Sequence, residues 1–414
     1  MKNGNLSRYY LFSISNLLAA FGGGLILGQG LGVIDIPYLQ HGSVLAFFVG
    51  TIFGLIFLNL IPNKFSKTLS QSFSICCATT SVILFCLFES FSLHGKMSGN
   101  IGLIFFALLC VRFGFWFYSR VIRASNASGQ QQSIAWVELG YYSGMILGLV
   151  IWKLLQINID LSAALIIDAS FQFIAGILDF KGNAIVVPEI SNQSDVSANS
   201  EKIPLFNLNP TWLWKLSLSV VLLTIGVQVV IFNLSHHVAE SFGVYILAIF
   251  YFGVASAAYV ANKLKMLLCW CNNVAYIEYN KIKKINLLLA AGVSAIFVIL
   301  SAFIANSNIF NNEYYRSFFI CAFIFFASFI YETMSLAILD RIGYEENNMH
   351  SSGMIMKTYG LMGLGAAIGL WCLGTITNNL DGSIIMVCGC FSIAVGLIRK
   401  RKSTNLNALE ITGN

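Results

Sequence analysis

The chain has 414 residues, of which 57% are hydrophobic and 10% charged, and its formal net charge is +6. Soluble proteins carry about 25% charged residues, so this chain cannot cover itself with polar surface in water, and its expected solvent is lipid. The positive charges lie at the ends of apolar stretches, which excludes the clustered basic face of a nucleic-acid-binding protein.

A membrane-spanning helix needs about 20 mostly apolar residues. The fold class is therefore predicted to be all-α, a polytopic membrane protein. The first span follows Lys2 and Arg8 without a small-residue cleavage site, so no cleavable signal peptide is expected. The twelve predicted spans lie at roughly 9–31, 42–61, 71–92, 99–119, 134–156, 162–180, 211–234, 242–262, 285–305, 316–339, 354–376 and 383–399.

Basic residues set the expected orientation. They gather after the even-numbered spans, for example at Lys64 and Arg120, and at both ends of the chain. The opposite loops are mainly acidic, with Asp35 and Asp160 as examples. Cytoplasmic loops carry an excess of Lys and Arg, so both termini are predicted to face the cytoplasm of a bacterial inner membrane.

A polar stretch rich in Ser, Asn and Pro divides the spans into six and six. A structureless stretch of this length is typical of a linker. The halves also repeat each other, because Arg341 to Leu370 aligns without gaps on Arg120 to Leu149. The predicted domains are an N-terminal six-helix bundle at 1–180, a cytoplasmic linker at 181–210, a C-terminal six-helix bundle at 211–400 and a cytoplasmic tail at 401–414.

Opposite charges lie inside this repeated helical hairpin. Arg112 and Glu138 lie equally far from a loop centre near Ser125, so an antiparallel hairpin would place them at one depth as a pair. Glu332 and Lys357 form the corresponding pair of the second copy, with the signs exchanged. An ionisable residue inside a membrane helix is costly and is by default a functional-site hypothesis.

Each of these residues has two interpretations. Arg112, with Trp116 on its helical face, is suited to bind a carboxylate or phosphate, or else makes a structural ion pair. Glu138, with Tyr142 on its face, is either a proton-coupling carboxylate or half of a static salt bridge. Glu332 is also placed to pair with Arg112 across the two halves, as a gate.

Other charged and small residues have structural interpretations beside functional ones. Arg120 and Arg123 either extend a basic stripe from Arg112 or only anchor the helix at the membrane surface. Asp168 is either a structural partner or a proton site. Small-residue packing faces between spans five and eight, or eleven and two, are predicted at Gly144, Gly148, Gly365 and Gly369.

Twelve spans in a six-plus-six duplication, with cytoplasmic ends and a polar central loop, resemble the major facilitator superfamily. That family's loop after span two carries glycines, an acid and several bases. Here Asn59 and Ser66 replace the glycines and Asn63 replaces the acid, while Lys64 and Lys67 keep basic positions. Asn262 and Lys263 repeat the pattern after span eight.

The resemblance implies a secondary transporter that moves a small solute by alternating access, with its site between the repeats. The run SRVIRASNASGQQQSIAWVELGYYSGM at 119–145 is similar to superfamily members that move polycarboxylate siderophores in Gram-negative bacteria. The solute is therefore expected to be anionic and its movement to be coupled to protons. The expected partners are this solute and the bilayer, and the chain is expected to act as a monomer.

Three alternatives remain at this stage. The chain could be a drug or metabolite efflux carrier of the same fold, or a membrane sensor without flux, which the missing loop acid favours. A membrane enzyme is disfavoured, because there are no paired catalytic carboxylates and no Ser-His-Asp pattern. Neither a cofactor nor a metal is expected, and no ATP-binding Gly-rich motif is present.

Overall fold

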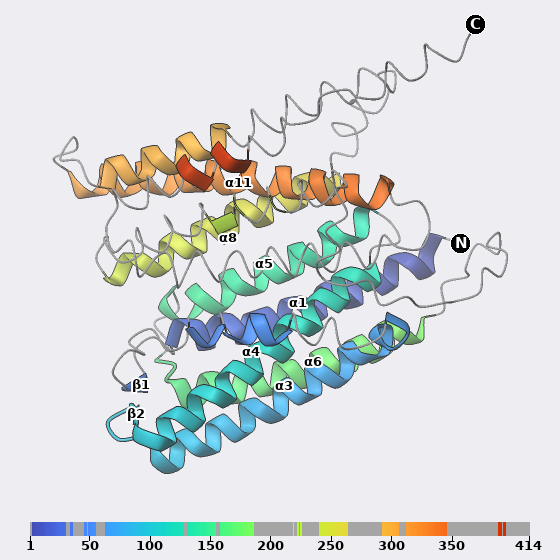
Figure 1. Ribbon diagram of the computed structural model, residues 1–414, viewed down its shortest axis with the longest axis vertical. Coiled ribbons are helices and arrows are strands. Elements are labelled where there is room, and N and C mark those ends of the chain that lie inside the picture. The colour runs from blue at the N-terminus through green and yellow to red at the C-terminus, as the bar shows by residue number, and fades with distance from the viewer. Residues whose placement is uncertain are drawn as a thin grey trace, which may run out of the picture.

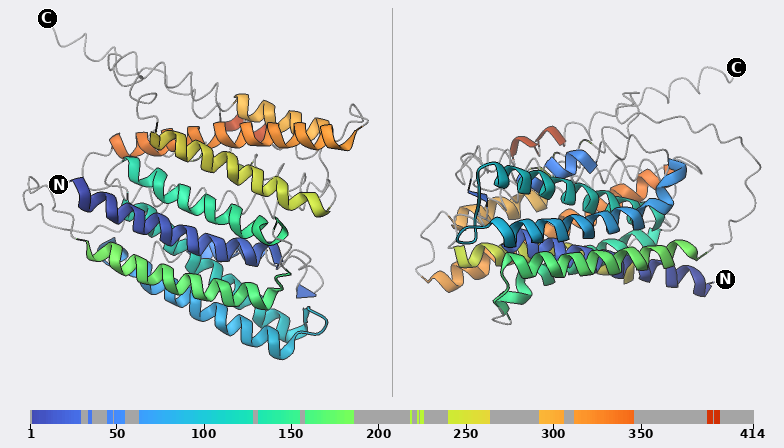
Figure 2. Two further views of the ribbon diagram at one scale, coloured as in Figure 1. Left: turned by 180° about the vertical axis from the view of Figure 1, so that it is seen from behind. Right: turned by 90° about the horizontal axis from the view of Figure 1, so that it is seen from below.

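The computed structural model describes residues 2–29, 34–35, 45–47, 49–54, 63–127, 131–154, 158–185, 218, 222, 224–225, 240–263, 292–305, 312–345, 388–390 and 392–394. Its long helices lie side by side in one bundle (Figure 1; Figure 2). They are α1 (Lys2–Gln29), α3 (Asn63–Phe91), α4 (Gly99–Ala127), α5 (Gln131–Leu154), α6 (Leu161–Ala184), α8 (Glu240–Lys263) and α11 (Glu313–Glu345).

Two very short strands connect loops at one end of the bundle. β1 (Ile34–Asp35) pairs in parallel with β2 (Met97–Ser98). The turn before β2 uses positive φ angles at His94 and Gly95, a conformation that costs glycine little. At the start of α6, the side chain of Asp160 accepts a hydrogen bond from the Ala163 amide at 2.8 Å and so caps the helix.

Among the described residues, five helices are long and apolar enough to cross a membrane. They are Arg8–Gln29, Leu69–Phe91, Gly99–Ala124, Leu161–Ala184 and Glu313–Thr333. Shorter apolar helices lie at Leu45–Gly54, Trp136–Ile151, Ala248–Val260 and Gly292–Ala305. Spans predicted within these regions are thus helical, and α4 and α11 run further than expected, to residues 127 and 345.

Several predictions fall mostly or wholly outside the described residues. They are the spans at 42–61, 211–234, 354–376 and 383–399, the linker beyond residue 185 and the tail at 401–414. At the described edge of the linker, α6 continues past residue 180 to Ala184.

Charged side chains lie inside the bundle and large apolar ones outside. Arg112 and Asp168 are fully buried, whereas Phe173 and Phe180 on α6 expose 52% and 61% of their surface. This inverts the arrangement of a soluble protein, in which ionised groups seek water. It fits a bundle whose outer surface contacts lipid and whose polar groups find partners inside.

The helices follow one another in space in an order that brings distant segments together. α1 packs between α5 and α6, and α3 packs between α4 and α6. α5 packs on α8, which in turn packs on α11 (Figure 1). The contact between α5 and α8 therefore joins the first part of the chain to the second.

A stripe of glycines lets α1 and α5 approach closely. A Cβ atom at any of the three would overlap a backbone oxygen of α1. The glycines are Gly140, Gly144 and Gly148, and the oxygens belong to Ser13, Leu17 and Phe21. The predicted small-residue packing at Gly144 and Gly148 is confirmed, but the predicted partner, span eight, is wrong, because these glycines face α1. Gly365 and Gly369 lie outside the described residues.

We expect Gly144→Ala to lower the free energy of unfolding by about 1–3 kcal/mol, because a methyl group at this contact forces two backbones apart. Alanine has a higher helix propensity than glycine, and this difference offsets about 1 kcal/mol of the cost of overpacking. Thermal unfolding of the purified protein in detergent measures the change. Gly389→Ala is the control, because a Cβ there meets no described atom within 4 Å. Equal stability of the two variants would contradict the prediction.

Candidate functional site

Two buried ion pairs connect α4 to α6. In the first, Nε and Nη2 of Arg112 donate to the two carboxylate oxygens of Asp168, at 3.1 and 2.5 Å. Ser81 of α3 also donates to Asp168, at 2.6 Å. Neither side chain of the pair is exposed. This two-pronged geometry satisfies both carboxylate oxygens at once, which a desolvated pair requires.

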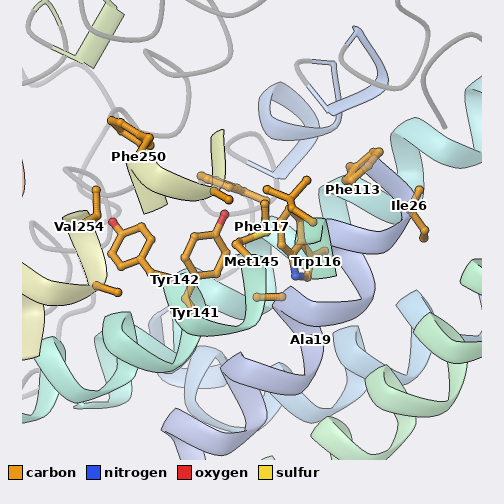
Figure 3. Packing of buried hydrophobic residues seen from close by; sticks show 14 of the residues in the cluster. Ala19, Ile26, Phe113, Trp116, Phe117, Tyr141, Tyr142, Met145, Phe250 and Val254 are labelled. Atoms are coloured by element: carbon orange, nitrogen blue, oxygen red, sulfur yellow. The ribbon is translucent and has the colours of Figure 1, made fainter. Parts of the chain in front are cut away.

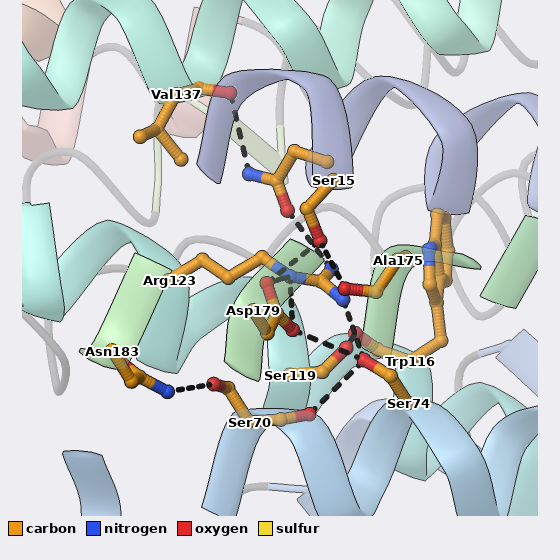
Figure 4. Close-up of polar contacts among 11 residues, drawn as sticks. Ser15, Ser70, Ser74, Trp116, Ser119, Arg123, Val137, Ala175, Asp179 and Asn183 are labelled. Carbon is orange, nitrogen blue, oxygen red and sulfur yellow. Dashed lines mark hydrogen bonds and ion pairs between the residues drawn. The ribbon is translucent and has the colours of Figure 1, made fainter. Parts of the chain in front are cut away.

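The second pair is Arg123 with Asp179. Nε of Arg123 lies 2.9 Å from both carboxylate oxygens (Figure 4). Its remaining nitrogens donate to Ser74 at 2.5 Å and to Asn16 at 3.1 Å. Ser15 donates to Asp179 at 2.7 Å. Side chains from α1, α3, α4 and α6 thus meet around one guanidinium group.

The two pairs repeat one geometry, and we call Arg112, Asp168, Arg123 and Asp179 together the ladder. The partners are 56 residues apart in both pairs. The step from the first base to the second along α4 therefore equals the step from the first acid to the second along α6. This step is about three helical turns, so parallel helices present the same faces again about 16 Å further along. The ladder has no exposed side chain, and we interpret it as a structural clamp.

A separate charged group lies where α4 and α5 meet α8 and α11. We call Arg120, Glu138, Tyr142 and Glu332 together the central cluster. Nη2 of Arg120 lies 2.7 Å from Oε2 of Glu138. The hydroxyl of Tyr142 donates to Oε2 of Glu332 at 3.5 Å, and Glu332 also interacts electrostatically with Glu138 and Arg120. Both carboxylates are buried.

Aromatic rings enclose the central cluster. The guanidinium carbon of Arg120 lies 3.4 Å from the centroid of the Tyr141 ring. Tyr141 and Tyr142 lie between Trp116 of α4 and the α8 residues Phe250 and Val254 (Figure 3). Rings around a cation in a dry environment stabilise its charge without neutralising it. Arg120 therefore keeps its positive charge beside Glu138.

Comparisons with known proteins identify the fold. No family model matches the chain, and no curated protein matches it. A solved bacterial homologue of the iron transporter ferroportin, in its outward-facing state, is 11% identical with a TM-score of 0.64, covering 94% of this chain and 97% of that one. The transporter FucP in its outward conformation is 14% identical with a TM-score of 0.61, covering 97% and 98%. A second structure of FucP, the Escherichia coli fucose:proton symporter, gives 12% and 0.56.

The chain has the major facilitator fold. The predicted fold class is thereby confirmed, since the match covers nearly the whole chain. The number of spans and the domain boundaries stay predictions.

Within the major facilitator fold, the predicted pairing of Arg112 with Glu138 is wrong. Arg112 binds Asp168, and Glu138 binds Arg120. The expected loop centre at Ser125 is the cause, because α4 continues to residue 127 and α5 begins at 131. The midpoint is therefore residue 129, and Arg120 and Glu138 lie equally far from it.

The predicted pairing of Arg112 with Glu332 across the halves is also wrong, because Arg112 is held on the α6 side of α4 and Glu332 faces Tyr142. Asp168, for which a structural partner and a proton site were both open, has Arg112 as its partner. Arg120 and Arg123 are members of buried pairs and not merely surface anchors. Trp116 lies between the two groups, 5.4 Å from the Arg112 guanidinium carbon and with its ring 5.7 Å from that of Tyr141.

The remaining predicted site residues lie elsewhere. Lys357 is outside the described residues. The expected loop motifs lie at the ends of helices: Asn63, Lys64 and Lys67 begin α3, and Asn262 and Lys263 end α8. In the described part of the chain, no three His, Cys, Asp or Glu side chains gather as metal ligands would.

Sequence reasoning missed Asp179 altogether. A usable signal was present in the equal spacing of charges, because the step from Arg112 to Arg123 in the sequence matches the step from Asp168 to Asp179. Parallel helices whose side chains reach one another bring such sets together at two levels.

Proposed function

We propose that the protein is a secondary transporter that moves a small anionic solute across the bacterial inner membrane by alternating access, coupled to protons. The major facilitator fold supports transport, and the central cluster supports the mechanism. The observation that carries the proposal is the buried contact of Tyr142 with Glu332. It joins α5 to α11 through two residues that are 190 positions apart in the sequence. Charged contacts between two bundles can form and break as a path opens and closes.

Arg120 is the residue we propose for binding the anion, in place of Arg112. Its side chain is 16% exposed, whereas those of Arg112 and Arg123 are fully buried in the ladder. A carboxylate that reaches Arg120 would replace Glu138, which binds the guanidinium through one oxygen only. Oε1 of Glu138 has no hydrogen-bond partner among the described residues.

Within this proposal the solute class is a polycarboxylate siderophore, supported by the similarity of residues 119–145 to siderophore carriers. The solved neighbours named for fucose and iron transport share only the fold with this chain. We further propose both termini in the cytoplasm, on the strength of the basic loops after even-numbered spans. We also propose that the carrier acts as a monomer.

A comparison of cells with and without the gene tests the function. We expect the inside-to-outside concentration ratio of one class of anionic chelators or metabolites to change several-fold. An agent that collapses the proton gradient should remove this difference. Accumulation inside would show import, and accumulation in the medium would show export, including the efflux alternative. If cells with and without the gene have identical metabolite profiles, under both iron-replete and iron-starved growth, the proposal is contradicted.

The matched variants are Glu332→Gln and Glu313→Gln on the same helix. Glu313 is an exposed residue in the first turn of α11. We expect cells with Glu332→Gln to show the inside-to-outside metabolite ratio of cells without the gene. Cells with Glu313→Gln should show the ratio of wild type. Both must be present in the membrane in equal amounts for the comparison to count.

A further inference from the structure

The charges of the central cluster do not balance among the described residues. One guanidinium group, Arg120, shares this buried space with two carboxylates, Glu138 and Glu332. Two ionised carboxylates would leave a net negative charge away from water, which is costly inside a membrane. Each ion pair of the ladder, by contrast, balances one base with one acid.

Glu138 and Glu332 differ in their contacts. Glu138 accepts a charge-assisted hydrogen bond from Arg120 at 2.7 Å, so the one cation of the cluster lies directly against its carboxylate. In the described part of the chain, Glu332 makes no ion pair, and the group that donates to it is the Tyr142 hydroxyl at 3.5 Å. A bound proton would therefore be held by Glu332.

The other polar groups near Glu332 do not supply a second cation. Glu138, Arg120 and Tyr142 interact with Glu332 directly. Tyr141 and Tyr251 lie against the Tyr142 ring, and Tyr331, the neighbour of Glu332 in the chain, is hydrogen-bonded to Thr224. Each tyrosine is neutral near neutral pH. The imbalance of one negative charge therefore persists when all of the described neighbours are included.

We infer that Glu332 holds one proton in this arrangement, and that on losing it Glu332 competes with Glu138 for Arg120. Tyr142 lies between the acid and the guanidinium, with its ring 5.8 Å from the Arg120 Cζ atom. Deprotonation releases one H⁺ to water and adds one negative charge beside Arg120. The contact between α11 and the α4–α5 hairpin is then strengthened, and Glu138 is released. Its role in coupling rests on the proposed function, but proton binding itself does not.

Infrared spectroscopy of the purified full-length protein in lipid nanodiscs tests the inference, with H⁺ as the only ligand. The carbonyl stretch of a protonated carboxylic acid is read at neutral pH in H₂O and D₂O. We expect Glu332→Gln to abolish one such band. Glu138→Gln should abolish it as well, because Arg120 then balances an ionised Glu332. Arg120→Gln should increase the band about twofold, because both carboxylic acids then become neutral.

The controls are Glu313→Gln, which should leave the band unchanged, and Glu332→Asp, which should keep a protonated acid at the site. Each variant must elute as a single species. Glu138→Gln, which should also abolish the band, carries the test if Glu332→Gln fails to fold. A band that survives in Glu332→Gln overturns the inference. A band that appears only after Lys357→Gln also overturns it, because Lys357 would then balance Glu332.

The two proposals fail separately. The band requires no solute, so a band without any metabolite difference between cells contradicts transport and leaves proton binding intact. Proton-driven transport without the band contradicts the inference alone.

Discussion

Replacing Asp168 with alanine is expected to lower the free energy of unfolding by about 3–5 kcal/mol, because it leaves Arg112 buried without a counter-charge. Both side chains are fully buried, and Asp168 accepts two hydrogen bonds from Arg112. Thermal unfolding of the purified protein in detergent, with the yield of single-species protein as a second measure, tests the prediction.

The double variant Arg112→Leu with Asp168→Leu is the control. Replacing both charges by apolar groups of similar volume removes the unpaired ion, so this variant is expected to be more stable than Asp168→Ala. A double variant that is less stable than Asp168→Ala would show that volume, not charge, sets the loss. Equal stability of Asp168→Ala and wild type would remove the structural role of the pair.

The second ion pair of the ladder tests whether the two losses of free energy of unfolding add. Asp179→Ala is expected to cost a similar amount, since Arg123 is equally buried. The two ion pairs are about 16 Å apart along the helices, and losses at such distances normally add to within about 0.5 kcal/mol. If the double variant loses much less free energy of unfolding than the sum of the two single losses, breaking the first ion pair has already released α6 from α4.

Arg120→Gln is expected to reduce transport about a hundredfold while the protein still folds. The change removes the one cation of the central cluster and leaves Glu138 and Glu332 without a charged partner among the described residues. A loss of about 3 kcal/mol in the arrangement that binds the anion corresponds to this factor. The measurement is the initial rate at which cells restore the inside-to-outside metabolite ratio after the gene is induced.

Arg120→Lys and Arg316→Gln serve as comparisons. Lysine keeps the charge but not the planar fork, so partial transport is expected. Arg316 binds the backbone oxygen of Ala305 at 2.7 Å, apart from the central cluster, and its replacement should leave the rate unchanged. Wild-type rates in Arg120→Gln would refute the role of Arg120 as the anion site.

The fold could be predicted because it depends on the order of apolar and polar residues along the chain. Runs of about 20 apolar residues determine where helices cross the bilayer, whatever their neighbours are. The helix ends were less predictable, because α4 extends through the polar residues up to 127. That extension moved the centre of the hairpin from residue 125 to residue 129, and the wrong partner for Arg112 followed from it.

The partner of each charge depends on rotation about the helix axis. At about 100° per residue, Arg112 and Arg123 differ by only about 20°, and both face α6. Arg120 lies about 80° from Arg112 and faces α5. The sequence places all three within one broad face, and that face is divided between two neighbouring helices.

Composition and spacing along the chain were enough to predict a helical protein in lipid with ionisable residues at Arg112, Glu138 and Glu332 inside it. The partners came from the packed helices: Arg112 binds Asp168, Arg120 binds Glu138, and Glu332 contacts Tyr142. The physical reason is that burial depends on composition along the chain. An ion pair, with its atoms in hydrogen-bond contact, depends instead on which helix is adjacent and how it is turned.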